Sequence, residues 1–143
     1  MVKVTGTKGN IVDVQILGVG EVLRLLQQKQ KRIIIGEELG IVRAGTFIQE
    51  EVKESIIGNR AEKKSVDSGN FANSIEFKKI AKDEGRVSPS SRKYPNGQTT
   101  DKVALILENG TSKIRPRRHF GNTKTRNQQK IKEIIEDEIK RNI

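Results

Sequence analysis

The stretch EELGIVRAGTFIQEEVKESII, residues 37–57, decides the fold because its apolar side chains recur at helical spacing. They follow one another by three or four residues: Ile41, Ala44, Ile48, Val52 and Ile56. Side chains at these intervals share one face of a helix. We therefore predict an amphipathic helix over residues 37–57, closed by Gly58 and Asn59.

A further helix is predicted directly before this stretch, over residues 20–35, where apolar side chains again lie near helical spacing. Gly36 is expected to separate the two helices. Gly40 and Gly45 interrupt the second helix. Each weakens it by up to about 1 kcal/mol, or else permits close packing against it.

Alternation of apolar and polar side chains predicts strands on both sides of these helices. Residues 2–5 and 11–16 form a β-hairpin around the turn cluster at 6–10. Residues 74–80 form a strand, and residues 102–108 form another. Because the 102–108 stretch is apolar on both faces, we expect it at the centre of the sheet.

The remaining segments are predicted to be connections and one last helix. Residues 61–73 are a polar linker, residues 82–101 are a long exposed loop or arm, and residues 111–122 are irregular and basic. A C-terminal helix covers residues 123–142. The order predicts a single α+β domain over residues 1–143, with a small, mostly antiparallel sheet packed against two or three helices.

The charge is unevenly distributed along the chain. The formal net charge is +10, from 28 basic and 18 acidic residues. Residues 109–132 hold eight basic residues and no acidic ones, while residues 133–143 hold two basic and four acidic ones. The excess is therefore one local block beside a net-acidic C-terminus, and an affinity of the whole surface for nucleic acid is not the simplest explanation.

The composition excludes several classes of site. The chain has no cysteine, which excludes disulfides, a thiolate nucleophile and cysteine-based zinc sites. It has one histidine, His119, so a multi-histidine metal site is excluded. The longest apolar run is five residues, and the N-terminus has no apolar stretch typical of a signal peptide. We expect neither a membrane partner nor secretion.

Two patterns suggest enzymatic chemistry, and neither is specific. Asp67 followed by Glu76 and Lys78 is the kind of spacing by which some nucleases hold Mg²⁺ near a lysine. An amphipathic strand with a solvent-facing Glu76 and Lys78 explains the same residues. His119 has no carboxylate nearby in sequence to orient it as a base, so we interpret it as a loop residue in a contact surface. We predict no catalytic residue, metal or cofactor.

The basic block allows two functional interpretations. Its Arg and Lys side chains could neutralise nucleic-acid phosphates, but only Phe120 is available there as a stacking aromatic. Alternatively, its arginines could form a subunit interface with carboxylates of a neighbouring copy, such as those between Glu133 and Glu138. A solvated loop without a role is a further interpretation, although Pro116 stiffens the segment and favours a defined conformation.

Three short segments in a fixed order resemble a known family. They are Ser68-Gly-Asn-Phe-Ala-Asn-Ser-Ile75, then Glu108-Asn-Gly-Thr111 at the end of the strand predicted over 102–108, and Arg115-Pro-Arg-Arg-His-Phe120. Their order and spacing are similar to those of the neck and tail-completion family of tailed phages, the minor tail component of lambdoid siphophages. The likeness covers residues 20–143. Asn109 and His119 depart from the family's usual aromatic and proline residues.

This resemblance implies a non-enzymatic structural protein of the virion neck or tail, assembled in the host cytoplasm. Similar proteins form rings between the capsid connector and the tail tube. The expected partners are further copies of the chain, about six or twelve in a closed ring, together with connector and tail-terminator or tail-tube proteins. DNA inside the channel is an alternative partner.

The resemblance and the basic block together give the expected interface residues. Those for the subunit or partner interface are Gly69, Phe71, Ser74, Ile75, Glu108, Gly110, Thr111, Lys113, Arg115, Pro116, Arg117, Arg118 and Phe120. Those expected in the arm are Arg92, Lys93, Tyr94 and Pro95. The alternatives to ring assembly are a basic nucleic-acid-binding protein and, with less support, the Mg²⁺-dependent nuclease.

Overall fold

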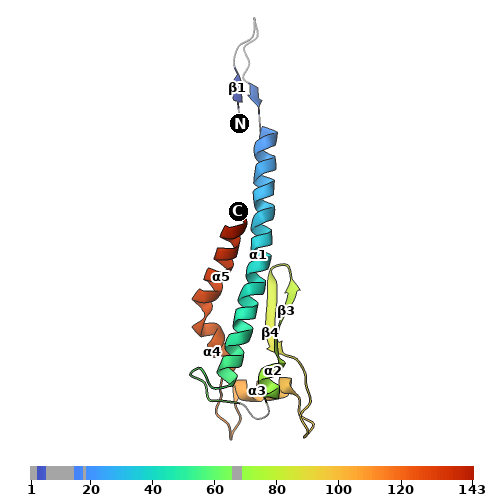
Figure 1. Cartoon of the computed structure of the whole chain (residues 1–143), viewed down its shortest axis with the longest axis vertical. Coiled ribbons are helices and arrows are strands. Elements are labelled where there is room, and N and C mark those ends of the chain that lie inside the picture. The colour runs from blue at the N-terminus through green and yellow to red at the C-terminus, as the bar shows by residue number, and fades with distance from the viewer. Residues whose placement is uncertain (1–2, 6–14, 18, 66–68) are drawn as a thin grey trace, which may run out of the picture.

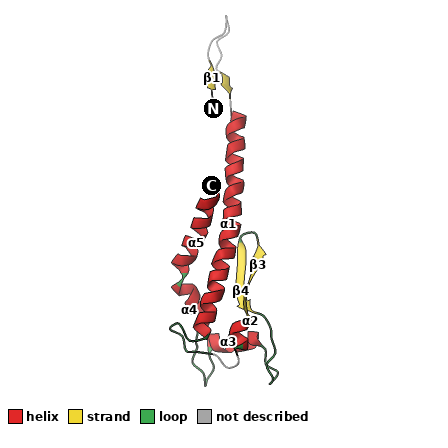
Figure 2. Cartoon of the chain, in the orientation of Figure 1, coloured by secondary structure: helices red, strands yellow, loops and turns green. Residues whose placement is uncertain are grey.

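A computed structural model describes residues 3–5, 15–17, 19–65 and 69–143 (Figure 1). Its elements in chain order are β1 (Lys3–Thr5), β2 (Gln15–Leu17), α1 (Val19–Ile56), α2 (Asn70–Ser74), β3 (Ile75–Ala81), β4 (Glu84–Pro89), α3 (Thr100–Asn109), α4 (His119–Arg126) and α5 (Gln128–Asn142). Helices dominate, and the strands form two-stranded sheets (Figure 2). The predicted α+β class is confirmed.

A single long helix organises the molecule. α1 has 38 residues and is therefore about 57 Å long. The prediction of two helices separated by Gly36 is wrong, because this glycine lies within the helix. A Cβ atom at Gly36 would lie 2.7 Å from the Cα of Ile139 in α5. The glycine thus permits close packing of two helices and does not end one.

α5 packs along α1 in the opposite direction, so that the C-terminus points toward the start of α1 (Figure 1). Gly40 lies at the same contact, where a Cβ atom would be 2.9 Å from the Cα of Ile135. Three residues after Gly40, Arg43 of α1 forms an ion pair with the buried Glu138 of α5. The close packing offered as one interpretation of Gly40 is therefore confirmed.

An antiparallel hairpin covers another side of α1. β3 pairs with β4 in a register that places Phe77 opposite Val87. The Phe77 ring packs on Gly45 of α1, where a Cβ atom would lie 2.2 Å from the ring. The strand predicted at 74–80 is confirmed. The loop or arm predicted over 82–101 is wrong at both ends, since β4 and the start of α3 occupy them.

The predicted central strand over 102–108 is also wrong, because this stretch lies within the helix α3. Only one side of the segment is covered: Ala104 is buried, whereas Leu105 is 63% exposed. Asp101 lies in the first turn, and Gly110, with a φ of 74°, terminates the helix. An apolar run of this length fits a short helix as well as a strand.

The C-terminal region has more helix than predicted. α4 begins at His119, inside the segment predicted to be irregular over 111–122. The last helix, predicted as one element over 123–142, is divided into α4 and α5 at Asn127. α2 likewise replaces the end of the predicted polar linker.

The predicted N-terminal hairpin is confirmed where the structure describes it, since β1 and β2 pair antiparallel with Val4 opposite Ile16. The predicted turn at 6–10 and the residues up to 14 lie outside the described residues. Asp67 and Ser68 also lie outside them.

The apolar core lies where α1 ends and α2, β3 and α3 meet. Its buried members are Val52, Ile56, Phe71, Ala72, Ile75 and Ala104, and half-buried Ile48, Val87, Tyr94, Leu107 and Phe120 pack against them. None of the described helices has both the length and the apolar character that crossing a membrane requires. The core thus brings the three resemblance segments to the same end of the molecule.

Candidate functional site

Three loops gather at this end of the molecule, and we call it the loop end. It consists of residues 57–65, 90–99 and 110–118 together with the adjoining α2 and α4 (Figure 1). Segments far apart in the sequence meet there. The rings of Phe71 and His119 lie edge to face, with their centroids 6.4 Å apart.

The first resemblance segment forms α2 and the start of β3. Gly69 precedes α2 with a φ of 81°, a conformation that glycine adopts without strain. Phe71, Ser74 and Ile75 are buried. The Ser74 hydroxyl donates a hydrogen bond of 2.6 Å to the carbonyl oxygen of Phe71. These side chains, predicted at an interface, lie inside the chain and position its backbone.

The second segment joins α3 to the third segment. The two carboxylate oxygens of Glu108 accept hydrogen bonds from the backbone N–H groups of Phe120 and Gly121, at 3.0 and 2.9 Å. A carboxylate at the first turn of α4 satisfies donors that have no partner within the helix. The Thr111 hydroxyl accepts from the backbone N–H of Ile114 at 3.0 Å. Glu108 thereby holds α4 against α3.

The third segment is held in place by close contacts. A Cβ atom at Gly110 would lie 2.7 Å from the Cδ of Pro116, so only glycine fits there. The backbone N–H of Arg117 donates to the carbonyl oxygen of Leu107 at 2.7 Å. Arg118 has a φ of 44°, the one positive value found among the described non-glycine residues. The predicted irregular segment therefore has a defined conformation up to Arg118.

His119 is only 1% exposed, so the prediction of a loop residue in a contact surface is wrong. Its Nδ1 lies 2.8 Å from the Oγ of Ser55, and its Nε2 lies 2.7 Å from the Oγ of Ser65. The Ser55 hydroxyl donates to Glu62 at 2.6 Å. Burial lowers the pKa of His119, and the nearby Glu62 carboxylate only partly opposes this effect.

These contacts determine the direction of each hydrogen bond. A carboxylate only accepts, so Ser55 donates to Glu62 and accepts from the Nδ1–H of His119. The neutral imidazole then accepts at Nε2 from the Ser65 hydroxyl, which itself accepts from Arg117 at 2.8 Å. A continuous chain of donors runs from Arg117 to Glu62.

Glu62 is the anionic end of this chain. Arg126 of α4 contacts both of its carboxylate oxygens, at 2.9 and 3.1 Å, and Asn122 donates at 3.3 Å. Burial by itself raises the pKa of Glu62, but hydrogen bonds from Arg126, Ser55 and Asn122 outweigh it and lower the pKa to about 2. The loop that follows α1 is thus fastened to α4 by a charged pair.

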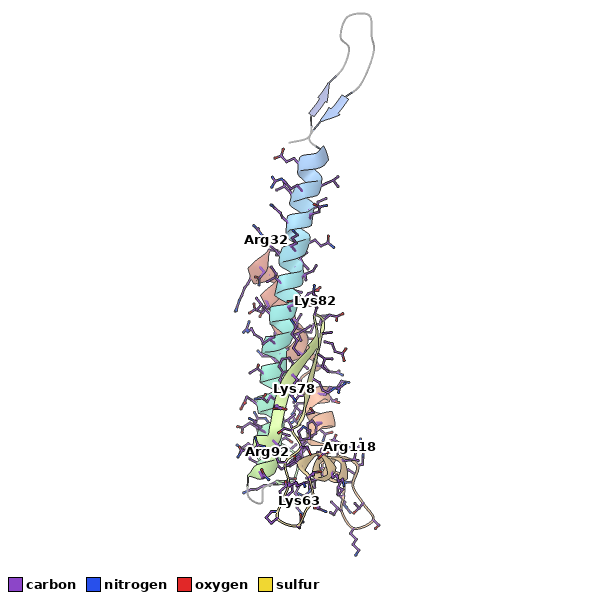
Figure 3. The ribbon with its side chains drawn as sticks, turned by 90° about the vertical axis from the view of Figure 1, so that its right-hand side faces the viewer. Arg32, Lys63, Lys78, Lys82, Arg92 and Arg118 are labelled. Carbon is purple, nitrogen blue, oxygen red and sulfur yellow. The ribbon has the colours of Figure 1, made fainter. Side chains whose placement is uncertain are left out.

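The basic side chains of the loop end fall into two groups. Arg117 and Arg126 are engaged inside the chain, on Ser65 and Glu62. Lys113, Arg115 and Arg118 are exposed, and none of them forms an ion pair with another described residue. Figure 3 shows Lys63, Arg92 and Arg118 at this same end. The positive surface therefore draws on all three loops.

A polar hollow of about 700 Å³ lies between two of these loops. Four basic residues line it: Lys63, Lys113, Arg115 and Arg117. The one carboxylate in the lining is that of Glu62, which already forms an ion pair with Arg126. Chemically, the hollow suits an anionic group such as a phosphate or a carboxylate.

The predicted arm residues form a compact turn. Lys93 pairs with Thr99 in an isolated antiparallel bridge, and the backbone N–H of Tyr94 donates to the carbonyl oxygen of Gln98 at 2.7 Å. Arg92, Lys93 and Pro95 are exposed. Tyr94 is half-buried and packs against the core. This turn is the part of the predicted 82–101 arm that remains a loop.

Glu76 and Lys78 of the nuclease pattern lie on the hairpin, in β3. Lys78 forms an ion pair of 3.1 Å with Glu76, and the Lys78 side chain is 71% exposed. Asp67 lies outside the described residues. Within the described part of the chain, no three acidic or histidine side chains are grouped as metal ligands.

Sequence reasoning missed the residues around His119. Ser55 and Glu62 are buried, although both are polar. One signal was present: Ser55 falls on the same helical face as Val52 and Ile48, where a polar side chain needs a buried partner. The partners Glu62, Ser65 and Arg126 come from loops and from α4, so spacing alone could not have identified them.

Comparison with protein families, with curated proteins and with solved structures found no match.

Proposed function

We propose that this chain is a structural virion protein of a tailed phage or prophage, which completes or joins the head–tail interface by assembling into a ring. One observation carries the proposal: the three segments of the resemblance, separated in the sequence, pack as one unit at the loop end. Phe71 of the first contacts His119 of the third, and Glu108 of the second binds the backbone of Phe120.

The shape of the chain also supports assembly. α1 extends beyond α5, and its first half exposes large apolar side chains, with Leu23, Leu25 and Leu26 each more than half exposed (Figure 1). Exposed apolar groups in such number mark surfaces that bind another protein. The interface residues proposed from the basic block are the exposed ones, Lys113, Arg115 and Arg118.

Deleting the coding sequence from the phage or prophage tests this function. We expect filled heads and separate tails that do not join, counted by electron microscopy, and joined particles when the chain is supplied from a plasmid. A plasmid carrying Glu108→Ala should restore fewer joined particles than the unmodified plasmid. This substitution removes the carboxylate that accepts hydrogen bonds from Phe120 and Gly121, and so loosens the packing of the three segments. A normal yield of joined particles without the chain would contradict the proposal.

The polar hollow favours a second candidate function, binding of the nucleic-acid backbone. Its basic lining combines Lys63 of one loop with Lys113 and Arg115 of another. Counting charges segment by segment places Lys63 outside the basic block, so only the structure shows this grouping. Lys and Arg side chains that neutralise phosphates make affinity fall steeply with salt.

Duplex DNA binding measured over a range of salt concentrations tests the second candidate. The variant Lys63→Gln, Lys113→Gln, Arg115→Gln should weaken binding and reduce the salt slope by about one for each phosphate that it no longer neutralises. A matched control removes three exposed charges from the hairpin: Lys78→Gln, Lys82→Gln, Arg86→Gln. Binding that is absent, or equally reduced in both variants, would exclude a specific role for the hollow.

A further inference from the structure

The dipeptide Asn-Gly occurs twice in the chain, as Asn96-Gly97 and as Asn109-Gly110. In such a pair the backbone nitrogen of the glycine can attack the side-chain amide of the asparagine and close a succinimide ring. Glycine has no side chain that would hinder this attack. The two pairs are chemically identical, so a difference between them in the folded chain comes from the structure around each.

The reaction is a deamidation, and water is its only co-reactant. The glycine nitrogen forms a bond to the Cγ of asparagine, and the bond from Cγ to Nδ2 breaks. Nδ2 leaves as ammonia, together with the proton that the glycine nitrogen has lost. Water then adds to one of the two ring carbonyl carbons and opens the succinimide to aspartate or to isoaspartate. The chain thereby exchanges a neutral amide for a carboxylate.

Asn96-Gly97 lies in an exposed turn of the loop end. The backbone N–H of Gly97 donates to the carbonyl oxygen of Tyr94 at 2.9 Å and closes the turn over residues 94–97. Asn96 and Gly97 are exposed, and beyond the chain neighbours no atom lies within 4 Å of a Cβ added to Gly97. An exposed backbone hydrogen bond with nothing packed on it opens at little cost in free energy. The Gly97 nitrogen is then available as a nucleophile.

The Asn96 side chain makes a hydrogen bond that activates its amide. Its Oδ1 accepts from the backbone N–H of Gln98 at 3.0 Å. A donor on the carbonyl oxygen draws electrons away from Cγ, and it stabilises the negative charge that develops on Oδ1 when the nitrogen attacks. The turn therefore combines an accessible nucleophile with a polarised electrophile.

Asn109-Gly110 is held in a way that opposes the same attack. Asn109 is the last residue of α3, and the Gly110 N–H donates to the carbonyl oxygen of Ile106 at 2.7 Å. A Cβ atom at Gly110 would lie 2.7 Å from the carbonyl oxygen of Ile114 and 2.7 Å from the Cδ of Pro116. The Gly110 nitrogen can reach the Cγ of Asn109 only if it leaves the helix end and this packed backbone moves. Because Asn109 is itself exposed, the protection comes from the backbone and not from burial.

We propose that Asn96 is a site of spontaneous deamidation in the folded chain, and that the end of α3 protects Asn109 in the same dipeptide. The modification places a carboxylate in the loop that carries the exposed Arg92 and Lys93, and so reduces the positive charge of the loop end. The isoaspartate form also lengthens the backbone and alters the turn. This chemistry does not depend on ring assembly.

Ageing the purified full chain at mildly alkaline pH, followed by peptide mass spectrometry, tests the proposal. Trypsin separates the two dipeptides, because cleavage at lysines leaves Asn96 in the peptide 94–102 and Asn109 in the peptide 103–113. We expect the first peptide to gain, with time, the mass difference between an amide and an acid, while the second remains unchanged. A sample digested before ageing corrects for deamidation during digestion.

The unfolded chain is the matched control. In guanidinium chloride both dipeptides lose their structure, and both should deamidate at comparable rates. Isoaspartate-specific methylation should label the aged folded chain, since direct hydrolysis of the side-chain amide would yield only aspartate. Asn96→Gln, at an exposed position, should remove most of this label, because glutamine has to close a larger ring that forms more slowly.

Three results would overturn the proposal. Equal deamidation of the two peptides in the folded chain would show that the end of α3 gives no protection. A peptide 94–102 that stays intact in the folded chain but deamidates in guanidinium chloride would show that the turn is protective. Aspartate without isoaspartate at position 96 would exclude ring closure by the Gly97 nitrogen.

Discussion

Gly36 of α1 and Ile139 of α5 meet backbone to backbone, at a distance that leaves no room for a Cβ atom on the glycine. The missing side chain is therefore what lets the C-terminal helix pack against the long helix. An alanine there would place its Cβ 2.7 Å from the Cα of Ile139, and a backbone atom cannot move aside as a flexible side chain can.

We predict that Gly36→Ala lowers the free energy of unfolding by about 1–3 kcal/mol, as overpacking in a tight contact does. Urea denaturation measures the change. Gly20→Ala is the matched control in the same helix, because nothing lies within 4 Å of its added Cβ. The control should be neutral or stabilising by up to about 1 kcal/mol. Equal effects of the two substitutions would show that α5 does not pack as described.

Glu62 makes stability depend on acidity. Its pKa is about 2 in the folded chain and 4.5 ordinarily. A lowered pKa contributes stability that is fully present above pH 4.5 and is lost as the pH falls toward 2. The loss attributable to this one group is of the order of 3 kcal/mol.

We therefore expect Glu62→Gln to be clearly less stable than the unmodified chain at pH 7 and equally stable near pH 2. Chemical denaturation at a series of pH values provides the comparison. Glu133→Gln, at an exposed carboxylate of α5, should differ little from the unmodified chain at any pH. A constant difference for Glu62→Gln across the whole range would contradict the ionic role of the Arg126 contact.

His119 should be neutral, with its proton on Nδ1. The direction of the hydrogen-bond chain requires Nδ1–H to donate to Ser55 and Nε2 to accept from Ser65. The ¹⁵N chemical shifts of the imidazole nitrogens report the tautomer directly. Because the chain has one histidine, these signals need no residue assignment. The Nε2–H tautomer, or an imidazole that titrates at its ordinary pKa, would disprove the arrangement. Ser55→Ala should weaken the preference for Nδ1–H.

Glu108 should stabilise the start of α4. Glu108→Ala removes the acceptor of two backbone N–H groups, and we expect a loss of about 1–2 kcal/mol, the size of a helix cap. Glu108→Gln retains the shape and one acceptor oxygen, so its effect should be smaller. Hydrogen exchange at Phe120 and Gly121 reports the cap directly. Unchanged protection of these amides in Glu108→Ala would refute this role.

The sequence predicted the fold class and the helical face of α1, because a long apolar repeat is a strong local signal. It misplaced the boundaries where a local signal has two meanings. Gly36 was interpreted as the end of a helix, since only the three-dimensional contact with Ile139 distinguishes a packing glycine from a terminating one. The run from Val103 to Leu107 was interpreted as a strand, although Gly110 after it is equally typical of a helix end.

The candidate site was only partly predictable. Exposed Lys113 and Arg115 were identified from charge, which is a local property. The partners of His119 were not, because Ser55 is 64 residues away from it in the chain and Ser65 is 54 residues away. β4 was missed for a related reason: Gly85 and Pro89 indicate a loop, and it is the pairing with β3 that makes the segment a strand.

Native mass spectrometry of the purified chain, at increasing concentration and with its connector and tail partners added, tests ring assembly most directly. We predict one discrete closed oligomer of about six or twelve copies, which negative-stain images resolve as a ring. A chain that remains a monomer with these partners present would contradict the proposed function.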